Sequence, residues 1–84
     1  MFKVEFTKNA IEQLKAADKG AALLVLGWIR RTLEDCREPG IYGRLIPDPE
    51  KELRRFRCGG FRIIAEITGS RIIVHVIGIG RSGL

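Results

Sequence analysis

Residues 53–67 have the sequence LRRFRCGGFRIIAEI, and this stretch decides the expected fold. In residues 53–58 successive side chains alternate between the two faces, with the period of two that is typical of a half-buried strand. Gly59 and Gly60 then offer a tight two-residue turn, and residues 61–67 form a second strand. The stretch therefore predicts an antiparallel β-hairpin that carries several arginines.

Two further strands are expected around this hairpin. After a turn at 68–70, residues 71–77 are apolar on both faces, which is typical of a strand inside a sheet. At the start of the chain, Phe2, Val4 and Phe6 alternate with polar residues and predict a half-buried strand. Residues 37–50, with Pro39, Pro47 and the other loop residues, are expected to be irregular.

Two helices are expected between the first strand and the hairpin. Thr7 or Asn9 can cap the first helix, and the DKG sequence at 18–20 separates it from a second helix at about 21–36. Apolar residues of the second helix recur at steps of three and four and predict one buried stripe: Ala22, Leu26, Ile29, Leu33 and Cys36, widened by Leu23, Val25 and Trp28. Trp28 is interpreted as a core anchor.

Together these elements predict an α+β fold in one small domain covering residues 1–84. The order is β-α-α-β-β-β, with a two-helix hairpin packed on a mainly antiparallel twisted sheet. The chain has 84 residues, of which 45% are apolar, so it can build only one small core.

Composition excludes several classes of protein. The apolar stretches at 21–29 and 72–79 are shorter than the roughly 18–20 residues that cross a membrane, and no signal peptide is recognised, so we expect a cytoplasmic protein without a membrane partner. Cys36 and Cys58 are predicted to be free thiols. One histidine and scattered carboxylates form no metal site, and no cofactor is predicted.

The formal charge is +5, and it is concentrated around the hairpin. Strand parity places Arg55, Arg57 and Arg62 together on the open face of the sheet, while Phe56 faces the helices. Three guanidinium groups on one face repel each other unless an anion binds there, and Arg suits phosphate oxygens. The alternative is a solvated strand face on which arginine only confers solubility. Arg54 has the core-facing parity and would have to leave the core at a sheet edge.

The sequence resembles the RelE/ParE superfamily of type II toxin–antitoxin toxins. The resemblance rests on residues 2–8 (FKVEFTK), on the helical pair and above all on residues 53–67, where basic-x-basic is followed by Gly, an aromatic residue, Arg and an apolar strand. It implies a small fold related to microbial ribonucleases. RelE-type members cleave messenger RNA in the ribosomal A site without a metal, whereas ParE-type members poison DNA gyrase and cut no RNA.

The resemblance also implies roles for single residues. Arg55 is expected to contact the reacting phosphate, Arg62 to stabilise charge in the transition state, and Arg81 to lie beside the leaving group, which makes these three the candidate catalytic residues. Four further basic residues are expected to bind RNA phosphates: Lys51, Arg54, Arg57 and Arg44. The implied partners are messenger RNA on the ribosome and an acidic, RelB-like antitoxin that forms a hetero-oligomer with the toxin and covers the arginines or the helix groove.

The sequence departs from the RelE pattern at two places. Leu53 stands where RelE-type enzymes often have Lys, and no Tyr follows Arg81, so that Tyr42 is the only tyrosine. Three alternatives stay open: an attenuated or truncated ribonuclease, a gyrase poison without catalytic activity, and an inactive module that binds antitoxin or RNA.

His75 and Glu66 are the remaining candidates for chemistry. The parity of the strand groups His75 with Ile73 and Ile77, which favours a buried, hydrogen-bonded histidine over a general acid or base. Glu66 shares the open face with Arg62, so it is expected to hold Arg62 by an ion pair more than to act as a general base.

Overall fold

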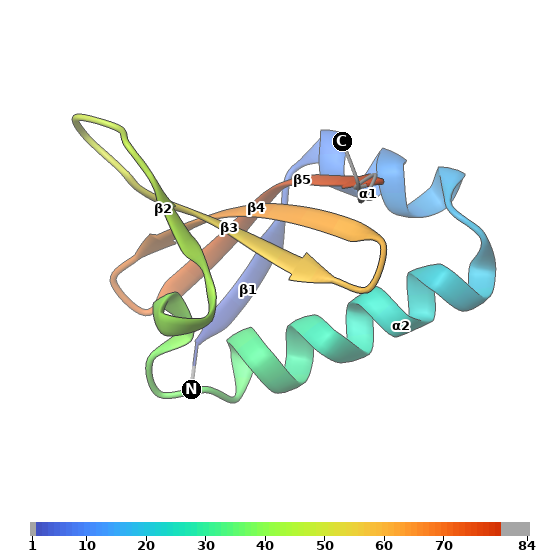
Figure 1. Cartoon of the computed structure of the whole chain (residues 1–84), viewed down its shortest axis with the longest axis horizontal. Helices are drawn as coiled ribbons and strands as arrows, with labels where there is room; N and C mark the ends of the chain where they lie inside the picture. The colour runs from blue at the N-terminus through green and yellow to red at the C-terminus, as the bar shows by residue number, and fades with distance from the viewer. Residues whose placement is uncertain (1, 80–84) are drawn as a thin grey trace.

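The computed structural model describes residues 2–79 and contains one five-stranded sheet in the order β1-β5-β4-β3-β2 (Figure 1). The elements follow the chain as β1 (Lys3–Phe6), α1 (Lys8–Ala16), α2 (Lys19–Ile29), the π-helical turn η1 (Arg30–Glu34), the 3-10 turn η2 (Pro39–Tyr42), β2 (Arg44–Ile46), β3 (Glu52–Cys58), β4 (Phe61–Thr68) and β5 (Arg71–Ile79). α2 and η1 run along one side of the sheet (Figure 1). No helix within the described residues is long and apolar enough to cross a membrane.

The predicted α+β class and the C-terminal meander are confirmed. β2, β3, β4 and β5 pair antiparallel in succession, and only β1 pairs parallel, with β5. The turn at Gly59 and the turn at Gly69 both need a positive φ of 58°, which glycine adopts without steric cost. The expected irregular segment 37–50 is wrong in part, because it contains η2 and the edge strand β2. A strand of three residues is too short to show an alternating pattern.

Side-chain caps set where the two helices begin. Thr7 Oγ1 accepts from the Ala10 N–H (3.2 Å), so Thr7 is the N-cap of α1. Asp18 Oδ2 accepts from the N–H groups of Gly20 and Ala21, so α2 begins at Lys19, two residues before the expected start. Only two residues separate the helices as a result.

The predicted buried stripe is confirmed only in part along α2 and η1. Val25, Ile29 and Leu33 are buried, whereas Leu26 is 40% exposed and Leu23 is 65% exposed. α2 is apolar on nearly every side, so periodicity could not choose the face that packs on the sheet.

The core joins this stripe to the sheet through aromatic packing. Trp28 packs edge-on against the buried Phe56, with ring centroids 5.8 Å apart, which confirms Trp28 as a core anchor. Gly43 lies directly against the Phe56 ring, because a Cβ at this position would come within 2.6 Å of it. The close approach of Gly43 brings η2 and β2 alongside β3.

A β-bulge in β5 changes which side chains face the helices. Ile64 pairs with Val76 and Ala65 pairs with Val74, so His75 has no partner on β4. Ala65 and Val74 are buried on the helix side, and the extra residue shifts the alternation so that Ile77 is buried as well. The predicted grouping of His75 with Ile77 is therefore wrong.

Candidate nucleic-acid interface

Four arginines lie on the sheet face opposite Phe56 because of the strand register. Arg57 on β3 is directly opposite Arg62 on β4, and Arg55 on β3 is directly opposite Arg44 on β2. Residues that face each other across a ladder project from the same side of the sheet. We call Arg44, Arg55, Arg57 and Arg62 the arginine face.

The arginine face concentrates charge without compensation. Among residues 2–79, no carboxylate forms an ion pair with any of the four arginines. Like charges directly opposite each other destabilise a sheet, and this register contains two such pairs side by side. In addition, Arg62 Nε is inaccessible to solvent and has no hydrogen-bond partner in the described part of the chain. An anion bound on this face would offset the repulsion between the four guanidinium groups.

The surface is hollowed beside these arginines. An open cavity of about 330 Å³ is lined by Tyr42, Arg44, Arg55 and Arg57. A second cavity of about 460 Å³ continues from Tyr42 and Arg57 toward Trp28 and Arg31. The two cavities share Tyr42 and Arg57, so they form one basic groove around the edge of β3. Tyr42 is 60% exposed, and the sequence alone predicted no role for it.

Arg54 does not join the arginine face. Its Nε donates to Glu52 Oε2 (3.1 Å) and its Nη1 donates to the Gly43 carbonyl (3.3 Å). These contacts hold the guanidinium by the η2 segment, in a cavity that it shares with Pro39 and Gly40. Arg54 thus escapes the core toward the edge formed by η2, as its parity required.

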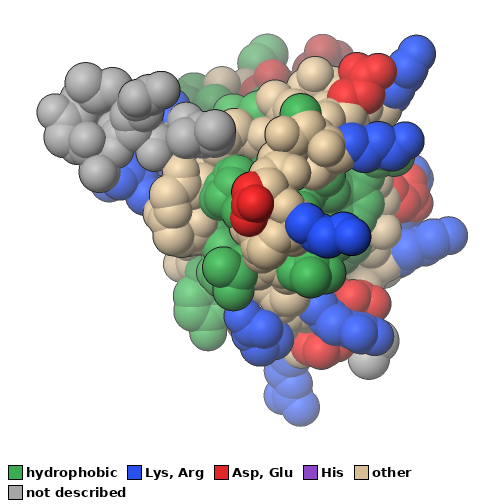
Figure 2. Space-filling view, turned by 90° about the vertical axis from the view of Figure 1, so that its right-hand side faces the viewer, with side chains coloured by type: hydrophobic (Ala, Val, Ile, Leu, Met, Phe, Trp, Pro, Cys, Tyr) green, Lys and Arg blue, Asp and Glu red, His purple; other side chains and the backbone are tan. Residues whose placement is uncertain are grey.

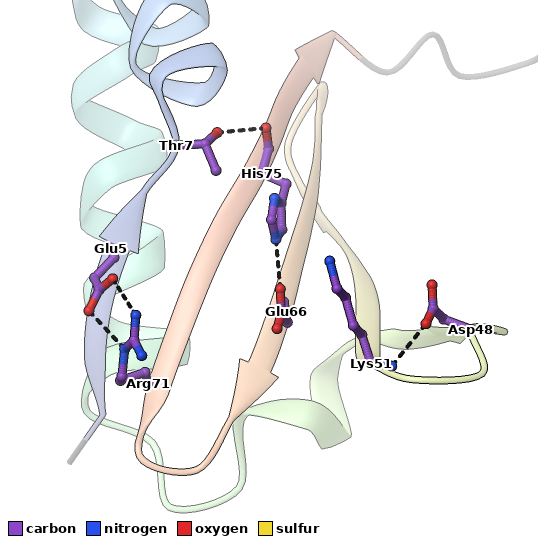
Figure 3. Close-up of polar contacts among 7 residues, drawn as sticks. All are labelled: Glu5, Thr7, Asp48, Lys51, Glu66, Arg71 and His75. Atoms are coloured by element: carbon purple, nitrogen blue, oxygen red, sulfur yellow. Dashed lines mark hydrogen bonds and ion pairs between the residues drawn. The ribbon is translucent and has the colours of Figure 1, made fainter.

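Lys51 lies in the loop that leads into β3. Its backbone N–H donates to Asp48 Oδ1 (2.9 Å), as does that of Glu50 (2.9 Å). These two bonds lower the pKa of Asp48, because they stabilise its ionised form. The Lys51 side chain is exposed and extends on the side of the sheet that carries Glu66 (Figure 3).

Glu66 contacts His75 and not Arg62. His75 Nε2 lies 3.0 Å from Glu66 Oε1, and the two side chains meet between β5 and β4 (Figure 3). The Glu66 side chain is 15% exposed and that of His75 is 33% exposed. The expected ion pair between Glu66 and Arg62 is therefore wrong, and so is the expected burial of His75.

Glu5 and Arg71 form a second polar pair on the sheet. Two bonds of 3.0 and 2.9 Å join the Arg71 guanidinium to the Glu5 carboxylate (Figure 3). Hydrogen bonding between the two side chains lowers the pKa of Glu5 and raises the pKa of Arg71. The pair connects β1 to β5, so Arg71 stabilises the pairing of these strands and is not part of the arginine face.

Two other sequence predictions concern metals and the C-terminal cation. Arg81 lies outside the described residues. Within residues 2–79, no group of three or more His, Cys, Asp or Glu side chains is arranged to hold a metal ion, and Cys36 and Cys58 are both free.

Comparison with known proteins identified one family and several solved structures of similar fold. The sequence model of the ParE toxin of type II toxin–antitoxin systems (parDE) matches residues 4–83. No curated protein sequence matches significantly.

Three solved structures resemble the chain closely in fold. A chromosomal ParDE system from P. aeruginosa has a TM-score of 0.76 at 17% identity, with 96% of this chain and 98% of that chain covered. A RelBE toxin–antitoxin complex from Mycobacterium tuberculosis has a TM-score of 0.75 at 18% identity, covering 93% and 96%. An archaeal RelE–RelB complex from Pyrococcus horikoshii has a TM-score of 0.74 at 20% identity, covering 98% of each chain.

Proposed function

Because the chain belongs to the ParE toxin family of type II toxin–antitoxin systems, within the RelE/ParE superfamily, we propose that it arrests translation by cutting messenger RNA on the ribosome. The arginine face carries this proposal. Its four guanidinium groups and the groove beside them favour the binding of a phosphodiester. The active unit would be the single domain 1–84, working in the cytoplasm where ribosomes are.

The chemistry suits a site without a metal. When an RNA 2′-hydroxyl attacks the adjacent phosphorus, extra negative charge develops on the non-bridging oxygens. Fixed cations aimed at that charge lower the barrier, and the loss of one such contact typically costs about 10²–10³ in rate. We assign this role to Arg55 and Arg62, with Arg44 and Arg57 holding the flanking phosphates.

The test is induction of the toxin in growing cells, followed by primer extension on translated messenger RNA. We expect new 5′ ends within reading frames, growth arrest, and loss of both in Arg62→Ala. Arg30→Ala is the matched control, because Arg30 is an exposed arginine on η1, away from the arginine face, and should retain full toxicity. Intact messenger RNA in arrested cells would refute the proposal.

A second candidate function is gyrase poisoning. The family model is that of ParE, and the apolar Leu53 lies on the same sheet face as the arginines, opposite Glu66. This function predicts double-strand DNA breaks and an SOS response with messenger RNA left uncut. The same induction experiment therefore separates the two, and harmless expression would indicate an inactive binding module.

The partner expected in either case is a cognate antitoxin. The solved relatives from M. tuberculosis and P. horikoshii are toxin–antitoxin complexes. The end of the molecule where α1 and α2 meet exposes apolar side chains among charges of both signs (Figure 2). Ile11 on α1 and Leu23 and Leu24 on α2 are exposed. An open apolar groove of about 230 Å³ runs on from Leu24 past Trp28 to Phe61. We propose that an acidic, amphipathic antitoxin segment docks on this surface.

A further inference from the structure

We propose that His75, oriented by Glu66, is the general base that accepts the 2′-hydroxyl proton of the RNA. This inference rests on the proposed cleavage of messenger RNA and assigns it a proton acceptor. His75 on β5 and Glu66 on the neighbouring strand β4 contact each other on the open face of the sheet.

The arginine face cannot supply this step by itself. A guanidinium stays protonated at every physiological pH, so it can hold a phosphate but cannot accept a proton. The chain has a single histidine, and an imidazole is the side chain whose charge changes near neutral pH. The bulge directs this histidine to the face where the phosphate would lie.

The contact with Glu66 defines which ring nitrogen is free. In the proposed arrangement Glu66 is ionised, and because a carboxylate only accepts hydrogen bonds, His75 Nε2 donates to Glu66 Oε1 at 3.0 Å. His75 Nδ1 is then left with a lone pair that can accept a proton. Glu66 also stabilises the imidazolium that forms.

The backbone of His75 is held in place as well. β1 ends at Phe6, which leaves the next part of β5 without a strand partner on that side. The side chains of Thr7 (3.1 Å) and Asn9 (3.2 Å) donate to the His75 carbonyl, and Gln13 Oε1 accepts from the Ile77 N–H (2.6 Å). These bonds fix the bulge, and with it the position of the imidazole.

His75 lies within reach of a phosphate held by the arginines. Arg62 on β4 pairs with Gly78 on β5, which is three residues from His75. At ~3.3 Å per residue and ~4.8 Å between strands, the Cα atoms of Arg62 and His75 are roughly 11 Å apart. Arg55 pairs with Ile64, which pairs with Val76. A phosphodiester lying over the half-buried Ile64 would thus be bordered by Arg55, Arg62 and His75.

The proposed step balances as follows. The 2′-hydroxyl proton moves to His75 Nδ1, the 2′-oxygen forms a bond to phosphorus, and the bond from phosphorus to the 5′-oxygen breaks. The 5′-oxygen takes a proton from solvent, and the imidazolium returns its proton to solvent. The products are a 2′,3′-cyclic phosphate and a 5′-hydroxyl end.

Other charged groups surround the pair. Glu66 lies on β4, and Arg71 on β5 interacts with it while pairing with Glu5 on β1. Lys51 extends on this side of the sheet from the loop before β3 (Figure 3), and Arg55 and Arg57 are the charged residues of β3 on this face. From α1, the groups that contact the His75 backbone are uncharged.

The test measures single-turnover cleavage of messenger RNA on programmed ribosomes between pH 5.5 and 8.5. For the wild type we expect a rate that rises with pH and levels off once the imidazole is neutral. His75→Asn and His75→Gln should each lower the plateau by about 10²-fold or more and abolish the inflection. Glu66→Gln, which alters a positioning residue, should cost about 10-fold and move the inflection.

Antitoxin binding by each variant serves as the control for folding. If both His75 variants bind antitoxin and cleave at the wild-type rate with the wild-type pH profile, while Arg62→Ala is inactive, the inference is overturned and the proposed function stands. If the wild type cleaves no RNA, the proposed function fails and the inference fails with it.

Discussion

Arg54 and Arg55 are neighbours in the sequence, yet the strand sends their side chains to opposite faces of the sheet. Arg55 faces Arg44 on the open side, whereas Arg54 donates to Glu52 and to the Gly43 carbonyl. Because successive side chains of a strand point to opposite faces, neighbouring basic residues in the sequence can have different roles, some structural and some functional.

This difference predicts separate effects of two adjacent substitutions. Arg55→Ala should lower messenger RNA cleavage by about 10²-fold because a phosphate contact is lost, with little change in melting temperature. Arg54→Ala should leave cleavage within a few-fold and destabilise the fold by about 1 kcal/mol, since it removes two hydrogen bonds that are partly exposed. Cleavage assays and thermal unfolding of both variants check the assignment, and the reverse pattern would contradict it.

Gly43 gives a second prediction at the scale of one residue. Gly43→Ala should destabilise the fold by about 1–3 kcal/mol, because the added Cβ would lie 2.6 Å from the buried Phe56 ring. Gly60→Ala is the matched control: nothing lies within 4 Å of a Cβ there, so we expect a change within about 0.5 kcal/mol. Urea unfolding measures both, and equal stabilities would refute the packing argument.

At the scale of elements, two features were beyond the reach of sequence patterns. The bulge at His75 reverses the alternation in β5, and no residue near it is of a type that predicts a bulge. The apolar sequence of α2 offers several possible buried faces, and the one that contains Val25 and Leu33 is selected by packing on the sheet. The strands and turns around Gly59 and Gly69 were predictable, because each depends on local alternation and on local backbone freedom.

The pairing of β1 with β5 should depend on pH through Glu5. Its pKa is lowered in the folded state by Arg71, so the pair contributes stability above the unfolded pKa and loses it as the pH falls through the folded pKa. Below the usual pKa of glutamate, the melting temperature of the wild type should fall as the pH falls. In Glu5→Gln the melting temperature should fall less over the same pH range. Glu12→Gln, on α1, is the control and should follow the wild-type curve; identical curves for all three proteins would exclude this role.

At the scale of the whole molecule, charge and apolar surface are separated. The arginine face lies on the open side of the sheet, while Leu23, Leu24 and Leu26 are exposed on α2, on the other side. This arrangement permits an antitoxin to be held by apolar contacts and to neutralise the toxin by covering the arginines with acidic residues.

The docking surface predicts the effect of a charge on α2. Leu24→Glu should weaken antitoxin binding by at least about 10-fold, because it places a carboxylate in an apolar contact and repels an acidic partner. Stability should change little, since Leu24 is 71% exposed. Leu45→Glu, at a 54% exposed leucine on β2, is the matched control. Calorimetric titration with the antitoxin measures both; equal affinities would place the docking surface elsewhere.

Local chemistry in the chain was enough to specify the helices, the meander and the parity of Arg55, Arg57 and Arg62, because capping, turns and alternation act over a few residues. Pairing between distant segments decided the rest: Arg44 and Tyr42 reach the arginines only through the edge strand β2, and Glu66 meets His75 rather than Arg62 only because of the bulge. Such contacts depend on which strands become neighbours and in which register, and no short stretch of sequence contains that information.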